Sequence, residues 1–139
     1  MWYRSNPFDI GNTTSKALKV INLDKIDPTI SYLNTLQHTK TSSSNGCLMR
    51  ITPLALYCSN MSKDDMYMTV ALQTMFTHPL KLAIDACYLY CYAISLLIAG
   101  KTRSETFKEV KSEASYRKME QIKSWLEDIE RPDALEIMP

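Results

Sequence analysis

Apolar residues recur along this chain every three or four positions, a spacing that places side chains on one face of an α-helix. The 139 residues contain few β-branched runs and three glycines, Gly11, Gly46 and Gly100. Each glycine falls where the apolar pattern is interrupted, as expected at helix boundaries. The pattern therefore predicts an all-α protein with about six helices.

The first half of the chain predicts three of these helices. The first runs from about residue 12 to residue 20, with an asparagine or threonine as its N-cap. The second follows Asp27 and Pro28, a capping residue and a proline suited to the first helical position. Its apolar face is expected to consist of Ile30, Leu33 and Leu36. The third begins at residues 44–45, and the proline at position 53 should kink or interrupt it.

The second half predicts three longer helices. One starts after Ser62, in a Ser-Lys-Asp-Asp string that resembles a capping box, and ends near residue 76. The next covers residues 79–99 and is closed by Gly100. The last begins at Thr102, with Glu105 completing a second capping box, and runs as a single amphipathic helix until Pro132. The charges between residues 103 and 131 are interpreted as its solvated face.

Composition limits the class of protein. Hydrophobic residues make up 45% and charged residues 22%, which is typical of one globular domain spanning residues 1–139. The formal net charge of +1 predicts neither nucleic acid nor a membrane as partner. The most apolar run, residues 86–100, is shorter than the roughly 18 residues of a membrane span and is interpreted as a core helix. The N-terminus has no apolar region of the kind found in signal peptides.

The four cysteines, at positions 47, 58, 87 and 91, have no zinc-ligand spacing and lie in apolar surroundings. Buried free thiols are the predicted state, because cysteine is commonly buried and positions 87 and 91 are not favourably placed for a bridge on one helix. Free thiols suit a reducing cytoplasm, which is the expected location.

The string TSSSNGCLMRITPL, residues 41–54, has two interpretations. It is either an ordinary helix cap, or an anion pocket in which free N–H groups at a helix start meet a negative ligand. Within the string, Arg50 either pairs with a carboxylate or points toward an anion. Met49 is expected in the core.

Two further segments contain candidate site residues. In PFDIGNTT, residues 7–14, Asp9 and Asn12 flank a glycine turn and either supply turn chemistry or project into one cleft. His78 lies in a Thr-His-Pro turn and either caps and packs a helix or hydrogen-bonds a phosphate or ribose. The acidic pair at positions 64–65 is interpreted as cap chemistry, because acidic residues are favoured in the first turn of a helix.

In their order along the chain, three segments resemble successive middle segments of the ADP-ribosylglycohydrolase family. They are PFDIGNTT, SNGCLMRITPLAL and THPLKLAIDACYLYCYAISLLIAG, within residues 1–100. Members of this family are all-α enzymes that remove ADP-ribose from modified proteins. The resemblance implies an orthogonal helical bundle in which residues 101–131 form a generic amphipathic helix and residues 132–139 a tail.

The resemblance also implies roles for individual residues. Asp9 and Asn12 would act at the catalytic end of the cleft, near the scissile ribose. His78 would contact the ligand from the opposite side. The diphosphate would be held by Ser43, Ser44, Asn45 and Gly46.

Family enzymes bind two magnesium ions through an N-terminal Thr-Asp-Asp-Thr motif and a C-terminal Asp-x-Asp-Thr motif. Neither string occurs in this sequence, so we assign no metal ligands and expect a truncated version of the fold. The resemblance implies a hydrolase of the glycosidic bond between ADP-ribose and a protein side chain if metal ligands come from elsewhere. The alternatives are a catalytically silent ADP-ribose-binding module and a remnant without a ligand. We expect self-association or a complementing chain to cover exposed apolar faces.

Overall fold

The computed structural model describes residue 5, residues 7–19 and residues 27–130. Over these residues it contains seven α-helices and no strand, which confirms the predicted all-α fold class. The predicted tail at residues 132–139 and the expected end of the first helix at residue 20 lie outside the described residues. The helices are α1 (Asn12–Lys19), α2 (Pro28–Thr39), α3 (Thr52–Tyr57), α4 (Lys63–Met75), α5 (Lys81–Ile98), α6 (Arg103–Tyr116) and α7 (Glu120–Ile129), and a 3-10 turn, η2 (Leu48–Arg50), precedes α3.

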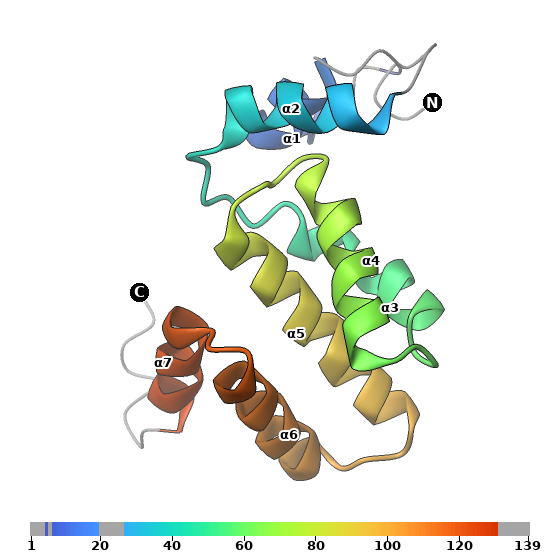
Figure 1. Ribbon diagram of the computed structural model, residues 1–139, viewed down its shortest axis with the longest axis vertical. Coiled ribbons are helices and arrows are strands. Elements are labelled where there is room, and N and C mark those ends of the chain that lie inside the picture. The colour runs from blue at the N-terminus through green and yellow to red at the C-terminus, as the bar shows by residue number, and fades with distance from the viewer. Residues whose placement is uncertain (1–4, 6, 20–26, 131–139) are drawn as a thin grey trace.

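Helix α5 occupies the centre of the molecule and contacts α3, α4, α6 and α7 (Figure 1). Helices α1 and α2 lie across one end of the α4–α5 pair, and α6 and α7 pack against α5. By length and composition alone α5 could cross a membrane, yet 44% of its residues are buried inside this fold. Its buried residues include Cys87, Tyr88 and Cys91, which belong to the main hydrophobic core. The structure therefore confirms the predicted core helix.

Three of the predicted helix starts are confirmed by their hydrogen bonds. The Asp27 carboxylate accepts from the N–H groups of Thr29 and Ile30 at 2.9 and 3.0 Å. Ser62 caps α4, and a complete capping box joins Thr102 and Glu105 at the start of α6. The interruption expected from the proline at position 53 is also present, because η2 ends at residue 50 and α3 begins at residue 52. These boundaries follow directly from local side-chain chemistry.

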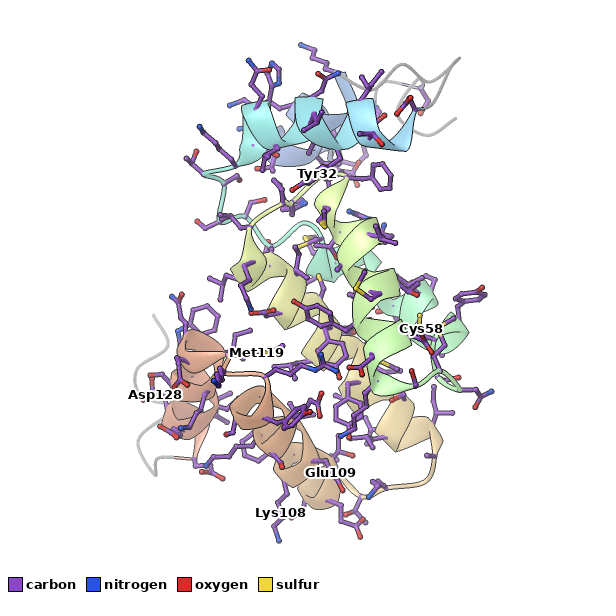
Figure 2. All side chains as sticks on the ribbon, in the orientation of Figure 1. Tyr32, Cys58, Lys108, Glu109, Met119 and Asp128 are labelled. Atoms are coloured by element: carbon purple, nitrogen blue, oxygen red, sulfur yellow. The ribbon has the colours of Figure 1, made fainter. Side chains whose placement is uncertain are left out.

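The predicted last helix is wrong in one respect, because it is two helices. Helix α6 ends where the Met119 N–H bonds the Ala114 carbonyl at 2.9 Å and the Lys118 N–H bonds Ser115 at 3.1 Å. Lys118 has a φ of 56°, so this turn is a Schellman motif with a lysine where glycine is usual. Met119 lies in the turn and is buried (Figure 2). Burial of this side chain explains why the chain reverses here although the sequence has no glycine or proline at this position.

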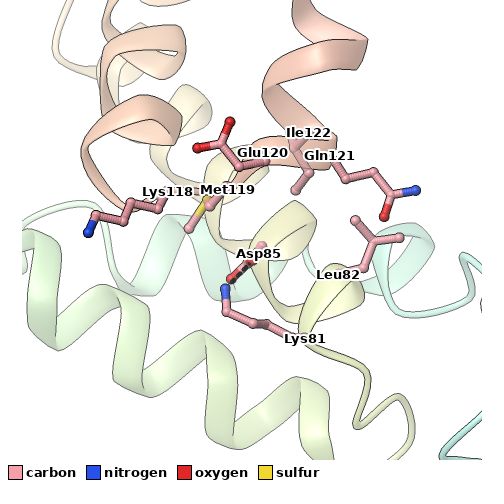
Figure 3. A pocket seen from close by; sticks show the side chains of 8 residues that line it. All are labelled: Lys81, Leu82, Asp85, Lys118, Met119, Glu120, Gln121 and Ile122. Atoms are coloured by element: carbon pink, nitrogen blue, oxygen red, sulfur yellow. Dashed lines mark hydrogen bonds and ion pairs between the residues drawn. The ribbon is translucent and has the colours of Figure 1, made fainter.

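The turn between α6 and α7 lies over the start of α5. A small cavity of about 260 Å³ remains there, with Lys118 and Met119 on one side and Asp85 on the other (Figure 3). The buried Asp85 carboxylate accepts hydrogen bonds from Lys81 at 2.5 Å and from the Tyr67 hydroxyl at 3.2 Å. The Asp85 carboxylate is therefore already paired within the protein.

Helix α2 differs from its predicted orientation. Ile30 and Leu33, expected on a buried apolar face, are 57% and 55% exposed. The buried positions are instead Ser31, Thr35 and Thr39, spaced four residues apart. The Thr35 hydroxyl donates to the carbonyl of Phe76 at 3.0 Å, which ties α2 to the end of α4. Small hydroxyl side chains allow close helix packing, so the buried face is polar and the apolar face is left outside.

The charged residues of α6 are also not all solvated, contrary to the sequence interpretation. Glu113 is 3% exposed and accepts hydrogen bonds from Lys63, Tyr88 and Arg117. The Arg117 guanidinium also bonds Asp64 at 2.7 Å. We call these five residues the Glu113 network. The four cysteines are buried and free, as predicted.

Candidate functional site

A cavity of about 780 Å³ lies between the start of α1 and the loop that leads into η2. This site cavity is larger than three other cavities among the described residues, which have volumes of about 260, 200 and 410 Å³. Its volume is within the range of small-molecule sites, roughly 300–1,000 Å³. It is lined by Asp9, Ile10, Gly11, Asn12, Thr13, Thr14, Ser44, Asn45, Gly46, Met49 and Arg50.

One wall of the site cavity is the turn before α1. Asp9 and Asn12 both line the cavity and both are exposed, so the structure brings these two predicted residues together at one opening. The Ser15 N–H bonds the Gly11 carbonyl at 2.9 Å, which fixes the turn to the first turn of α1. The hydroxyls of Thr13 and Ser42 lie 2.5 Å apart and join this wall to the opposite one.

The opposite wall is the loop of residues 44–46. Ser44, Asn45 and Gly46 line the cavity, whereas Ser43 does not. A Cβ atom at Gly46 would lie 3.3 Å from the Thr14 hydroxyl oxygen and 3.4 Å from Nε2 of His78. Any larger residue would press on both neighbours, so glycine allows the loop to approach α1 closely.

The predicted helix start at residues 44–45 is wrong. The only helical structure there is the three-residue turn η2, whose N-cap, Cys47, makes no side-chain capping bond. Within the described part of the chain, the N–H groups of residues 45 and 46 donate no hydrogen bond. Free N–H groups in a turn can bind an anion without a helix dipole. Met49, expected in the core, is 81% exposed and lines the cavity instead.

Arg50 lines the same wall and is half-buried. Its Nη2 donates to the Thr77 hydroxyl at 2.5 Å, and its Nε is buried with no hydrogen-bond partner. Among the described residues no carboxylate pairs with Arg50. Burial lowers the pKa of its guanidinium, while the nearby thiols of Cys47 and Cys87 act in the opposite direction. The ion-pair interpretation is therefore not supported, and a cation with a free donor lies beside the cavity.

His78 is completely buried and does not line the site cavity. Its Nε2 lies 2.9 Å from the Ser44 hydroxyl, and its Nδ1 lies 2.8 Å from the Thr77 hydroxyl. Burial and the positive charge of Arg50 lower the pKa of His78 to about 4. At neutral pH the ring is uncharged and reaches the cavity only through Ser44.

Three threonines near the site were missed by sequence reasoning. Thr13 and Thr14 belong to the cavity wall, and Thr77 links Arg50 to His78. Thr13 and Thr14 follow Asn12 directly, so their place in a glycine turn was the available signal. Nothing in the sequence distinguishes Thr77 from a threonine that caps or packs a helix.

The donor set of the site does not fit a pair of magnesium ions. Asp9 is the one carboxylate among the residues that line the cavity. Over the described ranges no group of three His, Cys, Asp or Glu side chains is placed to hold a metal ion. Two adjacent magnesium ions need several converging oxygen ligands. We therefore derive no reaction step through magnesium from these residues.

A family model for ADP-ribosylglycohydrolases matches residues 1–137, so the chain belongs to the ADP-ribosylglycohydrolase family. The match extends through α6 and α7, beyond the segments that carry the sequence resemblance. Members of this family act on ADP-ribosylated substrates and use metal ions. No curated protein and no solved structure matches the chain.

Proposed function

We propose that this member of the ADP-ribosylglycohydrolase family binds the ADP-ribose group of a modified protein in the site cavity. The observation that supports this best is the cavity itself, which has Asp9 and Asn12 on one wall and Ser44–Gly46 with Arg50 on the other. A diphosphate carries two negative charges and accepts hydrogen bonds, and the second wall offers a cation and free N–H groups.

The two walls suggest an orientation for the ligand. The diphosphate would lie against residues 44–46 and Arg50, and the ribose that is linked to the protein would lie near Asp9 and Asn12. Asp9 is exposed and could accept a hydrogen bond from a ribose hydroxyl. Ser43 and His78 would support this arrangement from outside the cavity wall.

Hydrolysis of the glycosidic bond is the activity proposed from family membership, and it needs metal ligands from outside the described residues. Magnesium, when bound, would supply the charge stabilisation that cleavage at the ribose requires. A second candidate, an ADP-ribose-binding module without turnover, is favoured by the single carboxylate on the cavity wall.

Isothermal titration calorimetry with ADP-ribose, with and without magnesium, tests the binding proposal. We expect a 1:1 complex that is weakened at least tenfold by Arg50→Ala, because charged hydrogen bonds contribute about 1.5–3 kcal/mol. Lys40→Ala, which removes an exposed cation outside the cavity, is the control and should bind normally. The absence of ADP-ribose binding by the wild-type chain would reject both candidates.

An assay that releases ADP-ribose from a modified protein separates the two candidates. Magnesium-dependent release by this chain alone would reject the silent module. Binding without release, restored to turnover by a second polypeptide, would support hydrolysis that depends on a complementing chain.

Contact with another chain, either a second copy or a complementing one, is also part of the proposal. Exposed apolar side chains on α2 and α4 support it, namely Ile30, Leu33, Met68 and Leu72. Sedimentation velocity at several concentrations tests self-association, and a monodisperse monomer that melts cooperatively would count against it.

A further inference from the structure

We propose that Arg50, Thr77 and His78 form a one-way chain of hydrogen bonds that leaves the Ser44 hydroxyl free to donate to an acceptor oxygen in the site cavity. The ligand part of this inference rests on the proposed function, because it concerns the same cavity. Thr77 and His78 are positioning residues in this scheme, since neither lines the cavity. The direction of the chain is a property of the protein without its ligand.

The four residues come from three separate parts of the fold. Arg50 ends η2, Thr77 and His78 form the connection between α4 and α5, and Ser44 lies in the loop before η2. The successive heavy-atom distances are 2.5 Å from Nη2 of Arg50 to Thr77, 2.8 Å from Thr77 to Nδ1 of His78, and 2.9 Å from Nε2 to Ser44. Thr77 and His78 are 5% and 0% exposed, so water has little access to the two middle links.

The direction follows from the first link. A guanidinium has five donors and no acceptor, so the Thr77 oxygen must accept from Arg50. The Thr77 hydroxyl still carries its own hydrogen, and among the described residues the acceptor in contact with it is Nδ1 of His78. Nδ1 therefore accepts, and it carries no proton.

The charge state of the ring fixes the next link. Burial and the nearby guanidinium keep His78 neutral at physiological pH, with a pKa of about 4. A neutral imidazole has one proton, which must then be on Nε2, so Nε2 donates to the Ser44 oxygen. Among the described residues the hydrogen of Ser44 has no acceptor, and Ser44 is exposed at the cavity wall.

This arrangement favours a ligand that places a hydrogen-bond acceptor next to Ser44. A hydroxyl held as a donor favours an oxygen that only accepts, such as an oxygen of a diphosphate. The opposite polarity, with Nε2 accepting from Ser44, would make Ser44 an acceptor at that position. Arg50 therefore contributes twice, once through its positive charge at the cavity wall and once through the polarity that it imposes on Ser44.

The tautomer of His78 can be measured by imidazole ¹⁵N NMR on the full chain without any ligand. The sequence has two histidines, so a His38→Gln variant assigns the signals of His78. We expect the Nε2–H tautomer at pH 7 in the wild type and in Thr77→Ser, which keeps the hydroxyl. In Thr77→Val the hydroxyl that donates to Nδ1 is lost, and the tautomer signals should shift toward a mixture. A wild-type Nδ1–H tautomer, or identical spectra for the serine and valine variants, would overturn the proposed direction.

The consequence for binding is tested with ADP-ribose and with inorganic pyrophosphate. We expect Thr77→Val to raise both dissociation constants about three- to tenfold, the range of one hydrogen bond, and Thr77→Ser to change them less than twofold. Ser44→Ala is expected to weaken binding by a similar factor. The double variant Thr77→Val, Ser44→Ala should be no weaker than Ser44→Ala alone, because both changes remove the same donor.

The NMR and binding measurements test different parts of the inference, so one part can be rejected without the other. An Nε2–H tautomer in a chain that binds neither probe would reject the proposed function and the ligand part of this inference, while the direction of the hydrogen bonds would stand. Normal binding with equal affinities for the serine and valine variants would reject the positioning role of Thr77 and leave the proposed function intact.

Discussion

At Glu113, between α4, α5 and α6, each buried charge meets an opposite charge, whereas at Arg50, beside the site cavity, the charge meets a hydroxyl. The Glu113 carboxylate accepts three hydrogen bonds, from Lys63 at 2.8 Å, Tyr88 at 2.7 Å and Arg117 at 2.6 Å. The guanidinium of Arg50 keeps a buried Nε with no partner. One network is complete within the protein, and the other has donors left over.

The pKa values of the two regions reflect the same difference. Burial alone would raise the pKa of Glu113, but the hydrogen bonds from Lys63, Tyr88 and Arg117 outweigh burial and lower it. At His78 no opposite charge among the described residues compensates, and burial together with Arg50 lowers its pKa to about 4. The comparison teaches that the first network stabilises the fold, while the second leaves binding capacity at a cost in stability.

The largest expected effect comes from breaking the complete network. We expect Glu113→Gln to lower the free energy of unfolding by about 3 kcal/mol, because Lys63 and Arg117 lose a buried opposite charge. Urea denaturation measures this, and ADP-ribose affinity should be unchanged. Glu109→Gln is the control on the same helix, since its carboxylate is 42% exposed. Equal stability of the two variants would show that the Glu113 network contributes little.

A pH titration should separate the two regions. The pKa of His78 is lowered from its ordinary 6.5 to about 4, so the unfolded chain takes up this proton first as pH falls. Stability from this residue is fully present above pH 6.5 and is lost down to about pH 4, by about 3 kcal/mol. The lowered pKa of Glu113 affects stability only below its ordinary value of 4.5.

Denaturation of the wild type and of His78→Gln between pH 4 and pH 8 isolates the first effect. We expect the stability difference between the two chains to fall as pH decreases from 6.5 to 4. A difference that does not depend on pH would mean that His78 titrates normally in the folded protein.

A smaller effect is expected at the loop of the site cavity. Gly46→Ala places a methyl group 3.3–3.5 Å from Thr14 and His78, and we expect a loss of about 1 kcal/mol with weaker ADP-ribose binding. Gly11→Ala is the matched control for stability, because nothing lies within 4 Å of its added Cβ and its φ is not positive. Melting temperature and calorimetry report the two effects. If both alanine variants behave alike, the close approach at Gly46 has no role.

The smallest effect on stability is expected in the turn between α6 and α7. Lys118→Gly removes the strain of a lysine at a φ of 56°, and we expect a gain of about 0.5–1 kcal/mol. Lys118→Ala keeps the strain and should leave stability nearly unchanged. Neither variant should change ADP-ribose affinity, because the turn lies away from the site cavity. A gain from alanine as large as that from glycine would contradict the explanation by backbone strain.

Local chemistry predicted most of the fold. The caps at Asp27, Ser62 and Thr102, and the end of α5 at Gly100 with a φ of 86°, each depend on side-chain or backbone preferences that the sequence displays. The break after α6 was not predictable in this way. It depends on Met119 reaching the core, and a lysine takes the position that usually identifies such an end.

Tertiary packing decided what the sequence pattern left open. The spacing of Ile30 and Leu33 indicated a buried face on α2, but the buried side chains are hydroxyls that pack closely and bond to the end of α4. At the candidate site the sequence identified residues on both walls, while the predicted helix start was wrong. Thr77 was missed because its importance depends on a contact 27 residues away in the chain.

The position of α1 has a consequence for how a ligand would be held. One wall of the site cavity belongs to the turn and first residues of α1, and α1 packs on α2, which reaches the rest of the fold at α4 (Figure 1). If the α1–α2 pair opened as a unit, the cavity wall that α1 contributes would move away from the opposite wall. A ligand that binds both walls would stabilise the closed position of the α1–α2 pair. Slower amide hydrogen exchange in both helices would then report how much of the site is occupied.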